Sequence, residues 1–194
     1  ITNNNYRGIN GGMGMNYELS PRTEIGILCF TNFYDYGTEN ISQIENKDNK
    51  DVLVSNINNN TIDQTKNQKH SVNLNLVSRL DSLGRKIDIN FDYTNFSNNG
   101  TIDYLTQTRT SVDDSLFAET NRLVRKANLF SGGIDYVHPI TKSVTLNLGG
   151  RYSYTTNKYK LAVFNDELNP GQEDTLKSNE FNYDEHIQAI YTSV

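Results

Sequence analysis

Residues 86–96 alternate almost without interruption between apolar and polar side chains, and this pattern constrains the fold more than any other part of the sequence. A β-strand sends successive side chains to opposite faces, so one face of this segment is apolar and the other is polar. Two carboxylates and an amide on the polar face favour water over a protein core. A run of about 9–11 alternating residues also suits a tilted strand that crosses a bilayer. The apolar set is Ile87, Ile89, Phe91 and Tyr93, and the polar set is Asp88, Asn90, Asp92 and Thr94.

The same alternation recurs along most of the chain, whereas helical periodicity is nearly absent. The best helical candidate, residues 115–126, is short and reads equally well as the start of a strand. We therefore predict an all-β chain of about seven strands. The segment 23–36 is clearly a strand, but both of its faces are apolar and leave its register open. The other predicted strands are residues 13–19, 71–80, 86–96, 130–136, 144–154 and 181–191.

Short and long connections alternate between these strands. The short ones contain Pro21, Gly84 and Pro139, residue types that tight turns favour. The long ones are polar and rich in Asn, Asp and Thr, and they cover residues 37–69, 97–121 and 157–179. Outer-membrane β-barrels join their strands by short periplasmic turns and long extracellular loops. The pattern therefore predicts an antiparallel up-and-down meander, an open segment of a large transmembrane β-barrel, with the tight turns on one edge and the long loops on the other.

This topology predicts which residues face lipid and which face the barrel interior. We expect Tyr93, Phe96, Tyr152 and Tyr154 to form part of an aromatic girdle at the membrane interface. Charged residues of the interior would stay hydrated and influence what passes, or would simply pair across strands or contact a plug. The expected lipid-facing residues are Ile87, Ile89, Phe91, Val144, Leu146 and Leu148, and the expected inward residues are Asp88, Asn90, Asp92, Asn147 and Arg151. The charged candidates for the interior are Asp88, Asp92, Arg79, Arg151, Asp135 and Asp184.

Composition and charge narrow the class of protein further. The chain has 194 residues and a formal net charge of −5, without a Lys/Arg cluster that would suit nucleic acid. Its lone cysteine, Cys29, excludes an internal disulfide and is expected to be a small buried or lipid-facing residue. No apolar run is long enough for a transmembrane helix. The chain starts at Ile1 and stops at Val194 inside an alternating segment, so we expect it to be an internal piece of a longer protein.

Four segments, in order, resemble the TonB-dependent-receptor-like outer-membrane β-barrels of Bacteroides-type bacteria. LDSLGRK at residues 80–86, followed by FDY at 91–93, resembles a periplasmic turn and strand of that family. IDYVHPI at 134–140 resembles its next turn, LGGRYS at 148–153 a glycine-containing strand, and FNYDEHIQAIY at 181–191 a later strand. The resemblance implies that residues 1–194 are a partial barrel domain. The N-terminal plug and the segment that contacts a TonB-type energising complex would lie outside it.

From this resemblance we expect an outer-membrane receptor that imports an unidentified nutrient, with membrane lipid, the rest of the barrel and a plug as partners. Two alternatives remain open at this stage. One is an outer-membrane barrel with a structural or adhesive role, and the other is a soluble surface β-domain that binds carbohydrate.

The sequence offers no catalytic, cofactor or metal site. The histidines and the cysteine lack metal-ligand spacing, and no phosphate-binding loop or nucleophile motif is present. We therefore expect a protein that is not an enzyme. The acidic segments 45–51 and 166–174 could chelate calcium, but they lack the features of an EF-hand loop and fit solvated loops better.

Overall fold

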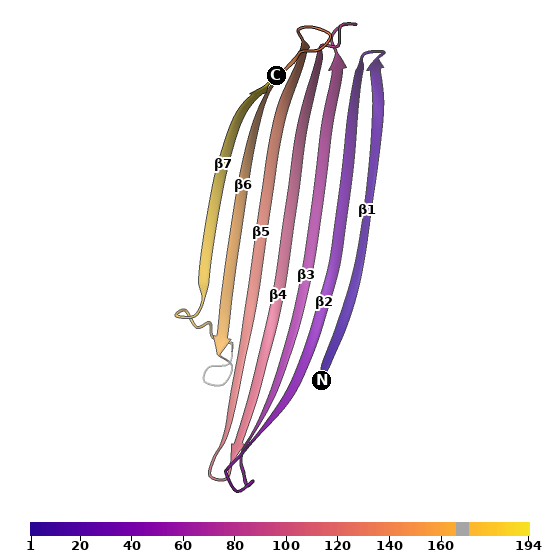
Figure 1. The fold of residues 1–194 in the computed structure, drawn as a ribbon. Helices are drawn as coiled ribbons and strands as arrows, with labels where there is room; N and C mark the ends of the chain where they lie inside the picture. The colour runs from indigo at the N-terminus through magenta and orange to yellow at the C-terminus, as the bar shows by residue number, and fades with distance from the viewer. Residues whose placement is uncertain (166–170) are drawn as a thin grey trace.

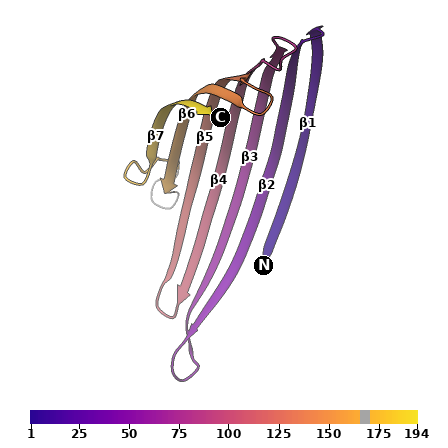
Figure 2. The same ribbon diagram turned by 45° about the horizontal axis from the view of Figure 1, so that its top comes forward.

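The structure, a computed structural model, describes residues 1–165 and 171–194 and consists of one curved, single-layered β-sheet (Figures 1 and 2). Its strands follow the chain in order, and each pairs antiparallel with its sequence neighbours. This confirms the predicted all-β meander. The strands of the described residues are β1 (Thr2–Ser20), β2 (Thr23–Lys47), β3 (Leu53–Arg79), β4 (Lys86–Thr110), β5 (Asp114–Pro139), β6 (Thr145–Asn165) and β7 (Asn179–Ser193).

The turns that contain Pro21 and Gly84, and the turn that follows Pro139, lie on one edge of the sheet, at the top in Figure 1. This placement confirms the prediction for the tight turns. The turn at Gly84 depends on a backbone φ of 94°, which glycine adopts without the steric cost of a Cβ. Asp81 closes the same turn, because its Oδ1 accepts hydrogen bonds from the backbone N–H groups of Leu83 and Arg85 at 2.9 and 3.1 Å.

Contacts within this turn stabilise the ionised form of the Asp81 carboxylate. Desolvation raises its pKa, but the backbone N–H groups of Arg85 and Leu83 and the Arg85 guanidinium more than offset that effect. The Arg85 Nε lies 3.0 Å from Asp81 Oδ2. The pKa of Asp81 is therefore lowered from its ordinary value of 3.8.

At the edge opposite the tight turns, the prediction of long loops is wrong. Residues 37–47, 53–69, 97–110 and 114–121 continue the strands, and residues 48–52 and 111–113 are short hairpin turns. In the third predicted loop, 157–179, residues 157–165 continue β6, and the described residues 171–178 precede β7. The segment 115–126, the helical candidate, lies wholly within β5. These extensions carry polar residues on both faces, which removes the apolar alternation by which a strand is recognised. Their backbone hydrogen bonds to neighbouring strands nevertheless persist along the full hairpins.

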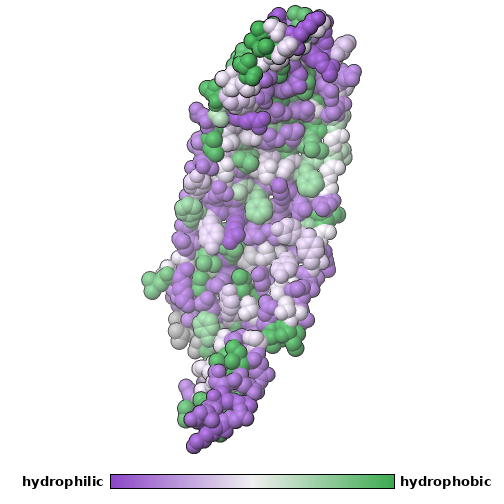
Figure 3. Space-filling view, in the orientation of Figure 1, coloured by the Kyte–Doolittle hydropathy of each residue, from purple (hydrophilic) through white to green (hydrophobic). Residues whose placement is uncertain are grey.

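The sheet has almost no core of its own. Among the described residues only Ala162 and Val163 are buried apolar side chains, while Met13, Ile134 and Leu148 expose 80%, 49% and 42% of their surfaces. The described residues contain no helix that is long and apolar enough to cross a membrane. The lower tip, where the β2–β3 and β4–β5 hairpins end, is mainly hydrophilic in Figure 3. Because large apolar side chains remain uncovered elsewhere on the sheet, they require an apolar environment outside this chain segment.

Candidate functional site

The pairing register divides the sheet into two faces, because residues directly opposite each other in an antiparallel pair point to the same side. We call the face that carries Ile87, Ile89 and Phe91 the apolar face. The face that carries Asp88, Asn90 and Asp92 is the polar face. Ile89 is opposite Leu76 and Ile134, which shows that the apolar face continues across β3, β4 and β5. The same register places Leu146 and Leu148 on the apolar face, and Val144 precedes β6 in the turn.

The first cluster of the polar face is centred on Asp92. Its Oδ1 accepts a 2.7 Å hydrogen bond from Asn73 Nδ2, and its Oδ2 accepts a 3.3 Å bond from Ser131 Oγ. These partners lie directly opposite Asp92 on β3 and β5. The carboxylate thus links three strands at the height of the apolar residues Phe91 and Leu74 on the reverse face. An ionised group at that height requires water or a polar partner in front of it.

The second cluster joins Asp135, Arg151 and Tyr191 on β5, β6 and β7. Tyr191 Oη donates to Asp135 Oδ1, and Arg151 Nε donates to Tyr191 Oη at 3.5 Å. An Arg151 guanidinium nitrogen lies 3.7 Å from Asp135 Oδ2. The Arg151 side chain remains 64% exposed, against 29% for Asp135, and its guanidinium has five N–H donors, more than these two contacts use. This cluster can therefore bind an additional anionic or polar group in front of the polar face.

Tyr191 lies across Gly149, and this contact requires glycine. A Cβ built on Gly149 would overlap the Tyr191 ring at its Cε2 atom. Gly149 is opposite both Asp135 and Tyr191, so the missing side chain leaves room for the tyrosine to reach the carboxylate. Gly149, which the sequence shows only as part of a strand motif, thus shapes the second cluster.

Most of the predicted interior charges share the polar face. Asp88, Asp92, Asp135, Arg151 and Arg79 lie on it, as do Asn90 and Asn147. Asp88 pairs with Lys86, whose Nζ lies 2.8 Å from Asp88 Oδ2, while Asp88 Oδ1 has no hydrogen-bond partner among the described residues.

Asp184 is the exception, and its predicted inward position is wrong. It is opposite Thr156, which is opposite Asn128, and this row belongs to the apolar face. The apolar set of β7, including Tyr183, Ile187 and Tyr191, therefore lies on the polar face. Alternation within β7 separates its residues into two sets, but it does not say which set joins the apolar face of the sheet. The register with β6 decides this.

An aromatic row crosses the apolar face where the strands begin to extend past the apolar residues. The ring centroids of Tyr93 and Phe130 are 4.6 Å apart, and those of Phe130 and Tyr154 are 6.5 Å apart. His186 continues the row, stacked 4.4 Å from Tyr154. The predicted girdle residues Tyr93, Tyr152 and Tyr154 share this face, whereas Phe96 lies on the polar face, opposite Ala127. Phe96 is therefore wrongly predicted as a girdle residue, because it is three residues from Tyr93 and has the opposite parity.

The structure describes the first candidate calcium segment and part of the second. Within 45–51, Asp48 Oδ1 accepts hydrogen bonds from the backbone N–H groups of Lys50 and Val52, and Lys47 Nζ lies 3.3 Å from Asp51 Oδ1. These bonds use the carboxylates to close a hairpin turn. Asp166 and Glu167 of the second segment lie outside the described residues. Within the part of the chain that the structure describes, no group of three His, Cys, Asp or Glu side chains is placed to hold a metal ion.

Cys29 lies on the apolar face between Met13 and Val72 and is exposed. This position agrees with the lipid-facing reading of the sequence.

A comparison with protein families finds a match across the second half of the sheet. The profile described as "Outer membrane protein beta-barrel family" matches residues 78–194, more than half of the chain. The matched region contains β4 to β7 and therefore Asp92, Asp135, Arg151 and Tyr191. No curated protein matches the chain.

Proposed function

The chain belongs to the outer membrane protein β-barrel family of the bacterial outer membrane, and from this premise we propose that it forms part of the wall of a TonB-dependent receptor for a nutrient. Residues 1–194 would be a partial barrel domain, whose apolar face meets membrane lipid. The polar face would surround the lumen and contact a plug domain. A TonB-type energising complex would act through the N-terminal region, and the receptor would have no catalytic role.

The observation that carries this proposal is the pair of charged clusters on the polar face. Asp92 and the Asp135–Arg151–Tyr191 cluster lie back to back with the apolar residues Phe91 and Leu148 on the reverse face. At membrane depth such groups are favourable only when they face water or protein in a lumen. Arg151 is the residue best suited to contact the plug or a passing solute, because its exposed guanidinium has donors that Asp135 and Tyr191 do not use.

The test is uptake by cells that carry the complete protein, compared between strains with and without the TonB-type complex. A panel of labelled nutrients should include at least one whose uptake needs both the protein and the energising complex. Arg151→Gln should lower that uptake without lowering the amount of protein in the outer membrane. Arg109→Gln, near the tip of the β4–β5 hairpin, is the matched control and should leave uptake unchanged.

Uptake that is absent or independent of the energising complex would contradict the proposal. An outer-membrane barrel with a structural or adhesive role would then be favoured. The polar β2–β3 and β4–β5 hairpins, which extend far beyond the apolar part of the sheet, would suit such a role. Loss of cell adhesion on shortening these hairpins, with uptake unaffected, would identify it.

A further inference from the structure

Beyond its aromatic row, the apolar face carries first a row of polar side chains and then cationic ones. The next same-face position on each strand carries Asn95, Asn128 and Thr156, which are connected along the row. Asn95 Nδ2 donates to Asn128 Oδ1 at 2.8 Å, and Asn128 Nδ2 donates to Thr156 Oγ1 at 3.3 Å. Tyr93 Oη also donates to Asn128 Oδ1, at 3.1 Å. The aromatic row is thus joined to a polar layer through Tyr93, as expected where hydrocarbon gives way to headgroups.

Cations occupy the positions that follow this polar layer on β5 and β6. Lys126 lies directly opposite Lys158, and both side chains are exposed. Like charges directly opposite each other destabilise a sheet unless an anion lies between them. Lys160 and Arg122 follow on the same face, and the Arg122 guanidinium lies over the Phe164 ring at 4.6 Å from its centroid. We call Arg122, Lys126, Lys158 and Lys160 the outer cationic patch.

The outer cationic patch has no ion-pair partner among the described residues. Across residues 1–165 and 171–194, none of its members forms an ion pair. The nearest acids on the same face of β7 are Glu180, opposite Lys160, and Asp184, opposite Thr156. Asp103 of β4 is on the same face, two residues beyond Thr101, which is opposite Arg122. Three carboxylates therefore lie near the four cations, and the Lys126–Lys158 pair has none directly opposite it.

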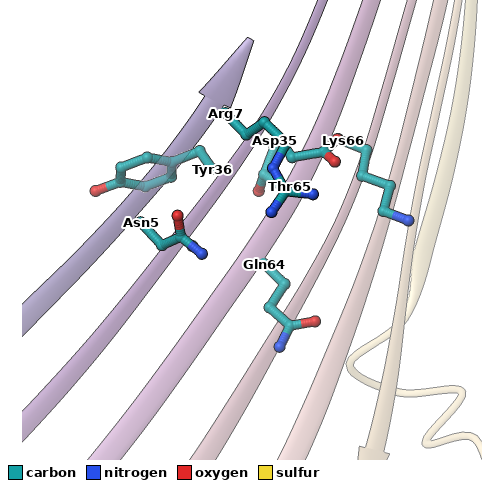
Figure 4. A pocket seen from close by; sticks show the side chains of 8 residues that line it. Asn5, Arg7, Asp35, Tyr36, Gln64, Thr65 and Lys66 are labelled. Carbon is teal, nitrogen blue, oxygen red and sulfur yellow. The ribbon is translucent and has the colours of Figure 1, made fainter.

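Another charged row on the same face provides a contrast. Asp35 lies on β2 between Arg7 of β1 and Lys66 of β3, directly opposite each of them (Figure 4). These side chains line a shallow depression of about 240 Å³ above Gly37. An acid between two cations stabilises the pairing of neighbouring strands, because opposite charges directly across from each other attract. Its absence at Lys126 and Lys158 points to an anion supplied from outside the chain.

The height of the patch matches the headgroup layer of a membrane. Lys126 is four residues from Phe130, and Lys158 is four residues from Tyr154, which is about 14 Å along each strand. With the tilt of about 35–45° usual for barrel strands, this is about 10 Å along the membrane normal. Headgroup layers extend about 5–8 Å from the hydrocarbon, and a lysine side chain reaches back along the surface to bring its ammonium into that layer.

We propose that the outer cationic patch binds the phosphate groups of lipid headgroups in the outer leaflet. Ammonium groups attract phosphate as point charges, and the guanidinium of Arg122 presents paired donors that match two phosphate oxygens. The proposal rests on the apolar face meeting lipid and does not depend on nutrient transport. Failure of either proposal can therefore be recognised separately.

The experiment uses the complete protein purified in a neutral detergent and mixed with lipid A that carries both phosphates. Lipid retained by the protein is counted by native mass spectrometry. The double variant Lys126→Gln/Lys158→Gln should retain at least about tenfold less of this lipid, given the usual gain from each cation near an anionic surface. Lys126→Arg/Lys158→Arg keeps the charge and should retain as much lipid as the unchanged protein.

The matched control removes two cations from the opposite face at a similar height. Lys69→Gln/Arg125→Gln should leave lipid retention unchanged, because both residues lie on the polar face. Dephosphorylated lipid A with the same acyl chains should bind weakly to every variant, and inorganic phosphate alone should not displace the lipid. Equal retention by the Lys126→Gln/Lys158→Gln protein, equal binding of dephosphorylated lipid, or displacement by inorganic phosphate would each overturn the proposal. Unchanged heat-modified migration on gels establishes that each variant is folded.

Discussion

Ile89 and Asn90 are adjacent in β4 but point to opposite faces of the sheet. Ile89 has 42% of its surface exposed among apolar neighbours, and Asn90 lies between Asn75 and Gly133 on the polar face. Ile89→Arg should cost about 2–4 kcal/mol of unfolding free energy in a bilayer, because the cation would be placed in hydrocarbon. Asn90→Arg, the matched control, should cost far less. Denaturant titration of the complete protein refolded into liposomes measures both values.

Cysteine labelling separates a lipid environment at Ile89 from a dry protein core. In a Cys29→Ser background, Ile89→Cys in intact cells should resist a water-soluble thiol reagent and react with a probe dissolved in the lipid. The background change is needed because Cys29 is exposed on the same face. Equal labelling of Ile89→Cys and Asn90→Cys by the aqueous reagent would contradict a membrane-facing strand.

The sequence predicts a site residue where its strand alternates clearly between apolar and polar side chains. Asp88, Asp92, Asp135 and Arg151 were predictable, because each alternates with large apolar residues in its own strand. The role of Tyr191 was not, since the sequence grouped it with the apolar side chains of β7. Its hydrogen bond to Asp135 depends on a register across two strand pairs and on the absence of a side chain at Gly149. The alternation within one strand shows neither this register nor the contact between Tyr191 and Gly149.

At the scale of strands, Gly149 of β6 leaves room for the Tyr191 side chain of β7 to reach across β6 to Asp135 of β5. Gly149→Ala should displace the Tyr191 ring and break its hydrogen bonds, at a cost of about 1 kcal/mol. Gly150→Ala is the control, because the nearest atom to its Cβ position is 3.7 Å away. Equilibrium unfolding in urea measures both.

A double variant tests whether the cost at Gly149 arises through Tyr191. Tyr191→Phe alone should cost about as much as Gly149→Ala, and the two changes together should cost less than their sum. Strict additivity would show that the glycine acts on the backbone instead.

Strand number and order were predictable, but strand ends were not. In the membrane-facing parts, one face must be apolar, and this requirement leaves a period of two in the sequence. Beyond the aromatic row both faces meet polar surroundings, so β3 gains residues such as Asn58, Asn59 and Asn60 without any periodic signal. Their pairing is set by continuation of the hydrogen-bond ladder from the membrane side and by Asp48, which closes the hairpin turn.

At the scale of the whole molecule, strand length places the two edges of the sheet on opposite sides of the membrane. β3 has 27 residues and is about 90 Å long, about three times the usual hydrocarbon thickness of 30 Å. The apolar rows lie near the tight turns, so the β2–β3 and β4–β5 hairpins should project from the cell surface.

Epitope tags provide the corresponding measurement. A tag inserted after Lys50 should bind antibody on intact cells, while a tag inserted after Leu83 should bind only after the outer membrane has been permeabilised. Both sites are exposed turns, and heat-modified migration on gels establishes that each tagged protein is folded. Binding to the Leu83 tag on intact cells would reverse the proposed orientation.

Because strand order equals chain order, the sheet has a simple route of assembly. Each new strand needs only the edge of the strand before it, and closing a short turn costs little loop entropy. An error of one residue in any hairpin would turn a row such as Asp88 and Asp135 toward hydrocarbon. The turns at Pro21 and Gly84, and the turn after Pro139, therefore set the alignment of the strand that follows each of them, and with it the side of the wall on which each charged row lies.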